Sequence, residues 1–245
     1  MIALIKSHGT AATAFFALFA AFVFFFPLTD TDIWWHLAAG REMIGRGAFL
    51  RIDPFSYTSA PGTSWINLHW MFQLIVFAVH RLGGTVLLAA TKGLALSGAA
   101  TLMLFAFSRP ALPWVSAAIM GSVLFFSRYL ADFRPVVFSL LYLSITITAL
   151  ERLFCSNDRR WIFVLAGVQL LWVNTQGLFI LGPVIAAMYA AGEAIQEMVM
   201  PENGAGRRLP DFSRVRSGIL SLGAMIAACL INPFGFRGLA LPLEL

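Results

Sequence analysis

Two consecutive apolar runs decide how this chain folds. They are Trp70–Val79 (WMFQLIVFAV) and Gly83–Phe107 (GGTVLLAATKGLALSGAATLMLFAF), and only His80, Arg81 and Leu82 separate them. As a helix, the second run is long enough to cross a hydrocarbon core of ~30 Å, whereas the first would cross only about half of it. The number of membrane spans therefore depends on whether the first run crosses the membrane or lies in a loop.

The composition identifies an integral membrane protein. The 245 residues are 59% hydrophobic and only 12% charged, and 23 of them are phenylalanine. A water-soluble domain of this size could not bury so much apolar surface, and the composition also excludes a disordered chain or a disulfide scaffold. The runs do not alternate polar with apolar residues, which excludes a spanning β-barrel. We therefore predict an all-α, polytopic transmembrane helical bundle.

The positions of the basic residues favour placing the first run in a loop. Six other apolar runs lie at Ala11–Leu28, Ala111–Phe126, Val136–Leu150, Trp161–Val173, Leu178–Ile195 and Ser217–Ile231. If Trp70–Val79 does not cross, one side of the membrane collects Lys6, Arg109, Arg152, Arg159, Arg160, Arg207, Arg208, Arg214 and Arg216. Basic residues concentrate on the cytoplasmic side, so the N-terminus is predicted to be cytoplasmic.

The resulting prediction is about seven spans in a single module over residues 1–245, located in the inner (plasma) membrane. Its first external loop covers residues 29–82. The net charge is +5, and we interpret its basic residues as groups that orient the chain in the membrane and contact anionic lipid headgroups. No nucleic acid partner is expected.

The start of this loop, from Thr29 to Ile44, is typical of an amphipathic helix lying on the outer leaflet. Asp30 or Thr31 would be its N-cap, and Ile33, Leu37 and Ile44 would form one apolar side. Asp32 and His36 are four residues apart and would share another face. The helix dipole would keep Asp32 ionised. An Asp-x-Asp pair at this position is also typical of simple capping.

The loop resembles the first external loop of the GT-C superfamily of membrane glycosyltransferases. It is most similar to the bacterial group described as dolichyl-phosphate-mannose-protein mannosyltransferase-like or RgtA-like. The matching motifs follow one order along the chain: Asp30-Thr-Asp32-Ile-Trp-Trp-His36, Gly40-Arg41, Arg51-Ile-Asp53-Pro-Phe-Ser-Tyr57-Thr, Trp65, Arg81-Leu-Gly-Gly84, Arg134-Pro135, Leu171-Trp-Val-Asn174 and Asn232-Pro-Phe-Gly235.

The resemblance implies an inverting transfer of a sugar from a polyprenyl-phosphate donor to an acceptor at the outer face of the membrane. In better understood relatives the catalytic carboxylate lies nine residues before an Arg-[Asp/Glu]-Met motif. Arg41-Glu42-Met43 begins nine residues after Asp32, which assigns that role to Asp32, with Asp30 as second candidate. The sugar and the acceptor are not specified.

Two departures separate the chain from that group. Where the group has Asn-x-His-Gly, this chain has Asn174-Thr175-Gln176-Gly177. The group's chains also continue beyond the Asn-Pro-x-Gly motif, whereas this sequence ends at Leu245, so the C-terminal part of the family is expected to be missing.

Six further residues are candidates for binding the substrate: His36, Arg41, Lys92, Asp132, Arg134 and Asn174. Lys92 lies within an apolar run, where it would meet the phosphate of the carrier, snorkel to the surface or pair with a loop carboxylate. Asp132 would lie near an acceptor or metal, or in a solvated turn. Arg41 would balance a lipid phosphate or pair with Asp32 or Glu42. No metal site is predicted, and a divalent cation is left open as cofactor.

Two other classes of function remain. A transporter or lipid-handling protein would fit the composition, but transporters tend to show inverted repeats and broken helices at mid-membrane. This sequence has no evident repeat, and its polar residues gather on the predicted external side. The other alternative is an inactive glycosyltransferase fragment.

Overall fold

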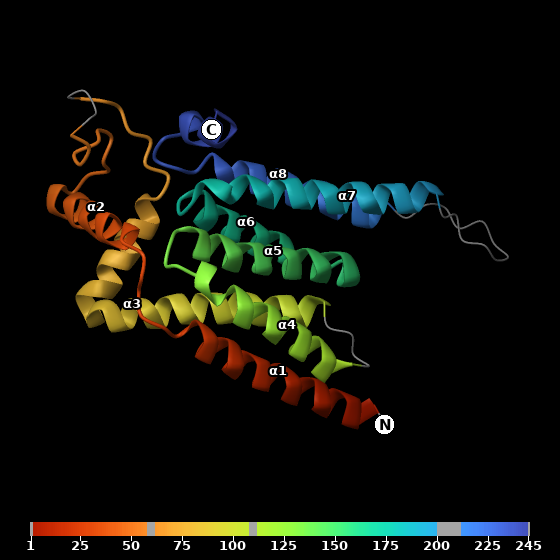
Figure 1. Cartoon of the computed structure of the whole chain (residues 1–245). Helices are drawn as coiled ribbons and strands as arrows, with labels where there is room; N and C mark the ends of the chain where they lie inside the picture. Colours follow the sequence, from red (N-terminus) through yellow and green to blue (C-terminus); the bar gives the residue numbers. More distant parts are fainter. Residues whose placement is uncertain (1, 58–61, 108–111, 200–211, 245) are drawn as a thin grey trace.

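The computed structural model describes residues 2–57, 62–107, 112–199 and 212–244. Within these ranges the chain is helical and contains no strand, apart from one isolated bridge between Ile52 and Ser64 (Figure 1). The elements are α1 (Ile2–Phe24), α2 (Asp32–Arg46), α3 (Trp70–Phe107), α4 (Pro113–Ser127), η1 (Arg128–Leu130), α5 (Val136–Ser156), α6 (Arg160–Val173), η2 (Gly177–Ile180), α7 (Leu181–Val199), α8 (Ser213–Cys229) and α9 (Phe236–Glu244). The predicted all-α class is confirmed.

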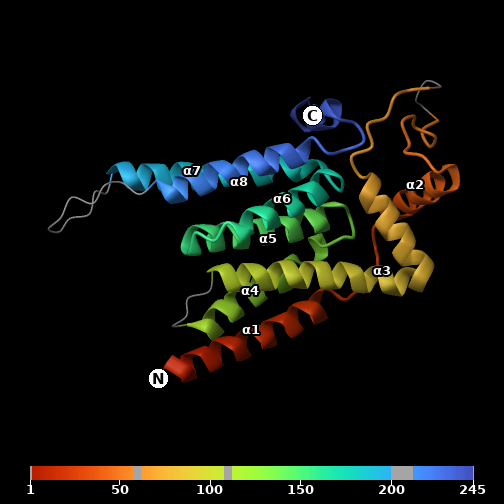
Figure 2. The same cartoon turned by 180° about the vertical axis from the view of Figure 1, so that it is seen from behind.

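The long helices lie side by side and run alternately in opposite directions (Figures 1 and 2). The main neighbours are α1 with α3 and α4, α3 with α5, α5 with α6, and α8 with α6 and α7. The segments that follow α1, η1, α6 and α8 gather at one end of the bundle together with α2; we call this the loop end. The N-terminus lies at the opposite end.

A break inside α3 follows the short apolar run Trp70–Val79 and precedes the long one. Gly83 (φ −154°, ψ 20°) and Gly84 (φ 61°, ψ −154°) leave the helical conformation, and the positive φ at Gly84 favours glycine. Residues 70–82 therefore form an arm that turns away from the bundle, whereas residues 85–107 run along it (Figure 1).

Three helical segments among the described residues are long and apolar enough to cross a membrane: Trp70–Phe107, Val136–Ser156 and Gly177–Met198. Gly9–Phe24 and Arg160–Val173 are shorter apolar helices. Each of the seven predicted spans coincides with a helix of the bundle, although α4 has only 15 residues and α8 only 17. Arg109, Arg207 and Arg208, which entered the charge argument, lie outside the described residues.

The bundle has an apolar core, in which alanines lie beside large side chains, and an apolar exterior. Phe16, Ala20, Ala100 and Ala117 join α1, α3 and α4, whereas a second buried cluster joins α5 to α8. Many large apolar side chains point outward instead, among them Leu18, Phe22, Phe163 and Met188. Helices that are apolar on both inner and outer faces are typical of proteins surrounded by lipid.

Helix α2 packs against the arm of α3 rather than presenting its apolar side to lipid. Ile33 and Leu37 are buried with Phe72 and Val76, as the predicted apolar side requires. Ile44, in contrast, is exposed, so this part of the prediction is wrong. The buried surface of α2 is formed by Ile33 and Leu37 in its first half and by Ala39, Gly40 and Met43 in its second half. Ile44 lies outside this surface.

Gly40 is the point of closest approach between α2 and the arm. A Cβ added there would clash with the Gln73 carbonyl oxygen and lie 2.7 Å from Phe77 Cβ. We expect Gly40→Ala to separate the two helices and destabilise the fold by about 1–3 kcal/mol, as overpacking does. The measurements are the thermal midpoint of the detergent-purified protein and its rate of proteolysis in the first loop.

Gly45 in the same helix provides the matched control, because nothing lies within 4 Å of a Cβ added there. Gly45→Ala should leave the midpoint unchanged or raise it slightly. A Gly40→Ala protein as stable and as protease-resistant as Gly45→Ala would contradict the packing of α2 against the arm.

Candidate functional site

Four of the candidate residues come together at the loop end, on two segments far apart in sequence. Thr29 Oγ1 donates a hydrogen bond of 2.8 Å to Asp132 Oδ1. Arg134 Nε donates to Asp30 Oδ2, and Arg134 Nη2 lies 3.4 Å from Asp32 Oδ2. We call Asp30, Asp32, Asp132 and Arg134 the charged cluster. It joins the segment after α1 to the segment that precedes α5.

The two aspartates of the Asp-x-Asp motif have different environments. The Asp30 side chain is only 7% exposed, and its Oδ1 accepts a 3.0 Å hydrogen bond from the Asp32 backbone N–H. The Arg134 hydrogen bond, which outweighs the opposing effect of burial, holds the pKa of Asp30 below its ordinary value. Asp30 therefore caps the start of α2, a role that the Thr31 side chain does not take.

The Asp32 carboxylate remains accessible. It lies in the first turn of α2, its side chain is 47% exposed, and its contact in the cluster is the 3.4 Å ion pair with Arg134. Asp30 is thus committed to holding the helix start, whereas Asp32 is free to meet a molecule from outside.

Arg134 holds the carboxylates of Asp30 and Asp32 in position and is not a free cation. Its guanidinium contacts both Asp30 and Asp32, and the Asp30 hydrogen bond raises its pKa above the ordinary value. A guanidinium with two carboxylate partners has little charge left to neutralise a phosphate. The structure therefore places Arg134 in the cluster but uses it to orient the two aspartates.

His36 lies in the protein interior, although the spacing had placed it on one face with the exposed Asp32. Its ring is 3.8 Å from that of Trp35, 4.9 Å from Phe72 and 5.9 Å from His69 between centroids. Burial lowers the pKa of His36 to about 3, with a smaller contribution from His69, and burial also lowers that of His69 to about 4. The prediction that His36 lies on a face other than the apolar side is wrong, because the side that α2 buries against the arm includes His36.

Lys92 is fully buried and contacts the chain that leaves α1. Its Nζ donates a 3.1 Å hydrogen bond to the Phe26 carbonyl oxygen and lies 3.2 Å from the centroid of the Phe26 ring. Asp132 interacts with its charge electrostatically. Lys92 thus neither reaches the surface nor forms a direct ion pair. It supports, from below, the segment that carries Asp30 and Asp32.

Arg41 lies away from the cluster. It is exposed on α2, ~13 Å along the helix from Asp32 and about half a turn around it. Its expected pairing with Glu42 does not form, because Arg46 Nε contacts Glu42 Oε1 at 2.6 Å. Arg41 is therefore a free surface cation at the loop end.

Asn174 is a structural connector. It is buried, accepts a 3.1 Å hydrogen bond from Trp70 Nε1, and donates to the carbonyl oxygens of Leu170 (2.8 Å) and Ile231 (2.9 Å). It thereby ties the arm of α3 to α6 and to the end of α8. The neighbouring Gln176, which stands where the resembling group has histidine, accepts a hydrogen bond from Ser139.

The Asn232-Pro-Phe-Gly235 motif also serves the fold. Asn232 Oδ1 accepts a 2.8 Å hydrogen bond from the Phe234 N–H, and Gly235 has a φ of 55°. Arg51 Nη2 donates to the Pro233 carbonyl oxygen at 3.3 Å, which joins the first loop to this turn. The motif thus holds the loop rather than contributing to the charged cluster.

Thr29 contacts the charged cluster, and the sequence did not identify it as a candidate. A threonine between a proline and an Asp-x-Asp motif gives no signal of its own, and its contact with Asp132 spans 103 positions of the chain. Among the described residues, no three His, Cys, Asp or Glu side chains come together in an arrangement that would hold a metal ion. Asp30, the innermost carboxylate, is already neutralised by Arg134.

The burial of His36 predicts a pH dependence of stability. The unfolded chain protonates this histidine near pH 6.5, but the folded chain does so only at about pH 3. Between these pH values unfolding therefore takes up a proton at His36. The contribution of the neutral ring to the free energy of unfolding is complete above pH 6.5 and decreases as the pH falls. Between pH 7.5 and 5 the loss from His36 is about 2 kcal/mol.

His36→Phe should reduce this loss, because phenylalanine fills the same aromatic site without titrating. The measurement is the denaturation midpoint at pH 7.5 and pH 5 in detergent. Between pH 7.5 and 8.5 the difference between the variant and the wild type should stay constant. Equal acid sensitivity in both proteins would show that His36 is not buried as a neutral ring.

Comparisons with protein-family models, curated proteins and solved structures found no match. The function must therefore be inferred from the charged cluster and from the ordered motifs along the chain.

Proposed function

We propose that this chain is a GT-C-like membrane glycosyltransferase. It transfers a sugar from a polyprenyl-phosphate donor to an acceptor at the outer face of the membrane. The observation that carries the proposal is the half-exposed Asp32 carboxylate, which Asp30 and Arg134 hold at a helix start above an apolar bundle. Fixed carboxylates at a membrane surface are suited to activating a hydroxyl beside a lipid-linked donor.

In this mechanism Asp32 is the general base. It accepts the proton of the acceptor hydroxyl, whose oxygen attacks the anomeric carbon from the face opposite the lipid phosphate. The bond between the anomeric carbon and the phosphate oxygen breaks, and the phosphate leaves with the electron pair. The anomeric configuration is inverted. Arg134 keeps the carboxylate in place, so little reorganisation is needed during the reaction.

Two cations would favour departure of the phosphate. Arg41 is exposed on α2 and has no carboxylate partner among the ion pairs of the described residues. Lys92 is buried below the segment that carries Asp30 and contributes its positive charge through the low-dielectric interior.

The same proposal includes the membrane arrangement. We place α1, the part of α3 after Gly84, and α4 to α8 across the plasma membrane, with the N-terminus in the cytoplasm and the loop end outside. The alternating directions of these helices and the bias of basic residues support this arrangement. The break in α3 lies at the loop end and not in the middle of the bundle, which favours an enzyme over a transporter.

Asp32→Asn tests the catalytic assignment. Removing a general base lowers the rate by about 10²–10⁴-fold, so transfer of radiolabelled sugar from a polyprenyl-phosphate donor in membranes should fall by that factor. The matched control is Asp53→Asn in the same loop, where Asp53 Oδ1 accepts hydrogen bonds from the N–H groups of Phe55 and Ser56. Asparagine can retain these contacts, so the control should transfer at the wild-type rate.

Transfer by Asp32→Asn at the wild-type rate would refute the role of Asp32. Absence of transfer by the folded wild-type protein from any such donor would refute the activity and favour the inactive-fragment alternative.

Cysteine labelling tests the topology with residues already in the chain. Cys155 is exposed at the last turn of α5, which lies at the end of the bundle opposite the loop end. Cys229 is buried. Tyr57 in the first loop is 98% exposed. A membrane-impermeant maleimide should label Tyr57→Cys in a Cys155→Ser background in intact cells, but should label wild-type Cys155 only after lysis. Labelling of both positions from the same side would refute the seven-span arrangement.

A further inference from the structure

Helix α6 carries an arginine and an apolar strip on one exposed side. Arg160, Phe163, Val164 and Gly167 lie at positions i, i+3, i+4 and i+7, so they share one face of the helix. All four residues are exposed, and Phe163 is 80% exposed. This face therefore points away from the interior of the bundle, with its cation at the start of the helix.

Helix α8 repeats this arrangement with different residues. Arg216, Ile219, Leu220 and Gly223 have the same spacing and are all exposed. Nothing lies within 4 Å of a Cβ added at Gly223, and the same is true of Gly167 in α6. Each helix thus presents an arginine, then two large apolar side chains, then an open gap at a glycine.

The two exposed sides lie next to each other. Helices α6 and α8 are packed neighbours and run in the same direction, and Figure 2 shows them in front of α5 and α7. Their starts are fastened together, because Asn157 Nδ2 donates a 3.2 Å hydrogen bond to Ser213 Oγ and Ser217 Oγ donates a 2.8 Å hydrogen bond to Asn157 Oδ1. We call the eight residues of the two repeated patterns the α6–α8 face.

The two arginines of this face are available to an anion. None of the ion pairs within the described residues involves Arg160 or Arg216, whereas Arg214 contacts Glu193 at 3.9 Å. The carboxylate of Asp158, in the turn before α6, accepts a 3.0 Å hydrogen bond from the Arg160 backbone N–H instead of contacting a guanidinium. The edge of the face is therefore positively charged.

A second copy of this chain would be a poor partner for the α6–α8 face. A twofold axis along the membrane normal keeps two copies in the same orientation, and it would bring Arg160 and Arg216 of one copy close to those of the other. Such like-charge contacts are unfavourable. An anionic lipid would neutralise the arginines instead, while its chains cover the apolar strips.

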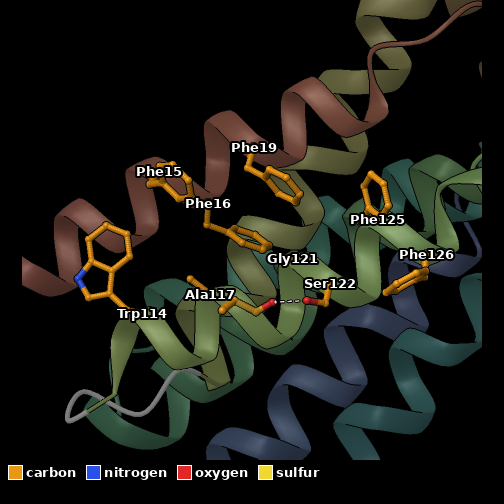
Figure 3. Close-up of a pocket in the computed structure, with 10 residues that line it drawn as sticks. Phe15, Phe16, Phe19, Trp114, Ala117, Gly121, Ser122, Phe125 and Phe126 are labelled. Atoms are coloured by element: carbon orange, nitrogen blue, oxygen red, sulfur yellow. Dashed lines mark hydrogen bonds between the residues drawn. The ribbon is translucent and has the colours of Figure 1, made fainter.

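Another apolar surface, the groove between α1 and α4, lacks this charge. Its volume is about 460 Å³, and none of the residues that line it is charged; aromatic side chains such as Phe16, Phe19 and Trp114 predominate (Figure 3). Because lipid tails are already in an apolar solvent, an apolar groove alone distinguishes poorly between lipids. The α6–α8 face can discriminate, since it joins apolar strips to two cations.

We propose that the α6–α8 face binds a phospholipid with two phosphate groups, of the cardiolipin class, at the cytoplasmic side of the membrane. One phosphate contacts Arg160 and the other Arg216, and the acyl chains lie along the two apolar strips and past the two glycines. A lipid with a single phosphate would leave one guanidinium without its anion. This inference rests on the arrangement of the helices across the membrane proposed above, but not on sugar transfer.

The test is a titration of the full chain in detergent with tetraoleoyl cardiolipin, followed by native mass spectrometry. We expect the wild type to retain one cardiolipin. Arg160→Gln and Arg216→Gln should each weaken binding by about fivefold, and the double variant by about 25-fold, through loss of the charged contacts. Both side chains are exposed, so the thermal midpoint without lipid should stay at the wild-type value.

Arg152→Gln is the matched control. Arg152 is exposed at the same end of the bundle, but its guanidinium carbon lies 5.1 Å from the centroid of the Phe105 ring, on the side of α5 that faces α3. This variant should bind cardiolipin like the wild type. Equal weakening by Arg152→Gln, or wild-type binding by the folded double variant, would overturn the inference.

Competitors identify the ligand class. Phosphatidylglycerol has one phosphate and should displace cardiolipin only in large excess, whereas pyrophosphate has two phosphates without chains and should not displace it. Displacement by either at a concentration equal to that of cardiolipin would overturn the inference.

The experiment is independent of sugar transfer, so an inactive wild type that still binds cardiolipin would refute the proposed activity alone. Labelling of Cys155 from outside intact cells would refute the cytoplasmic placement, even if cardiolipin binds in detergent.

Discussion

The ion pair between Arg134 and Asp30 joins segments that are 104 residues apart in the chain, and the loop end is organised around it. Asp30 uses its other oxygen to cap α2, so one side chain fixes both the direction of that helix and the position of Asp32. Lys92 holds the preceding residues from below through the Phe26 carbonyl oxygen. Without these contacts, a half-exposed carboxylate would be one mobile loop charge among several.

Local pattern was enough to predict the helices. Long apolar runs predict helices in a membrane protein because lipid offers the backbone no hydrogen-bond partner, so its N–H and C=O groups must bond to one another. Each apolar run lies in a helix here. The shortness of the first run and the positions of the basic residues indicated a separate segment, and the break at Gly83 and Gly84 follows that run. Helical spacing also placed Ile33 and Leu37 on one side of α2 correctly, but that side packs on the arm of α3.

The partners of polar side chains could not be predicted in this way. His36 is buried because α2 packs on the arm, and Lys92 faces a carbonyl oxygen that belongs to another helix's end. Asn174 was a candidate for binding the substrate, yet its hydrogen bonds connect α3, α6 and the residues that follow α8. Such roles depend on contacts between residues more than thirty positions apart, whereas spacing along one helix reports only which side chains share a face.

The contact between Arg51 and the Pro233 carbonyl oxygen has a consequence for biogenesis. It joins residues 182 positions apart, so the segment around Arg51 gains this anchor only after Pro233 has been made. At translation rates of ~5–20 residues per second, that interval is roughly ten to forty seconds. The segment around Arg51 therefore waits for this contact well after it has left the ribosome.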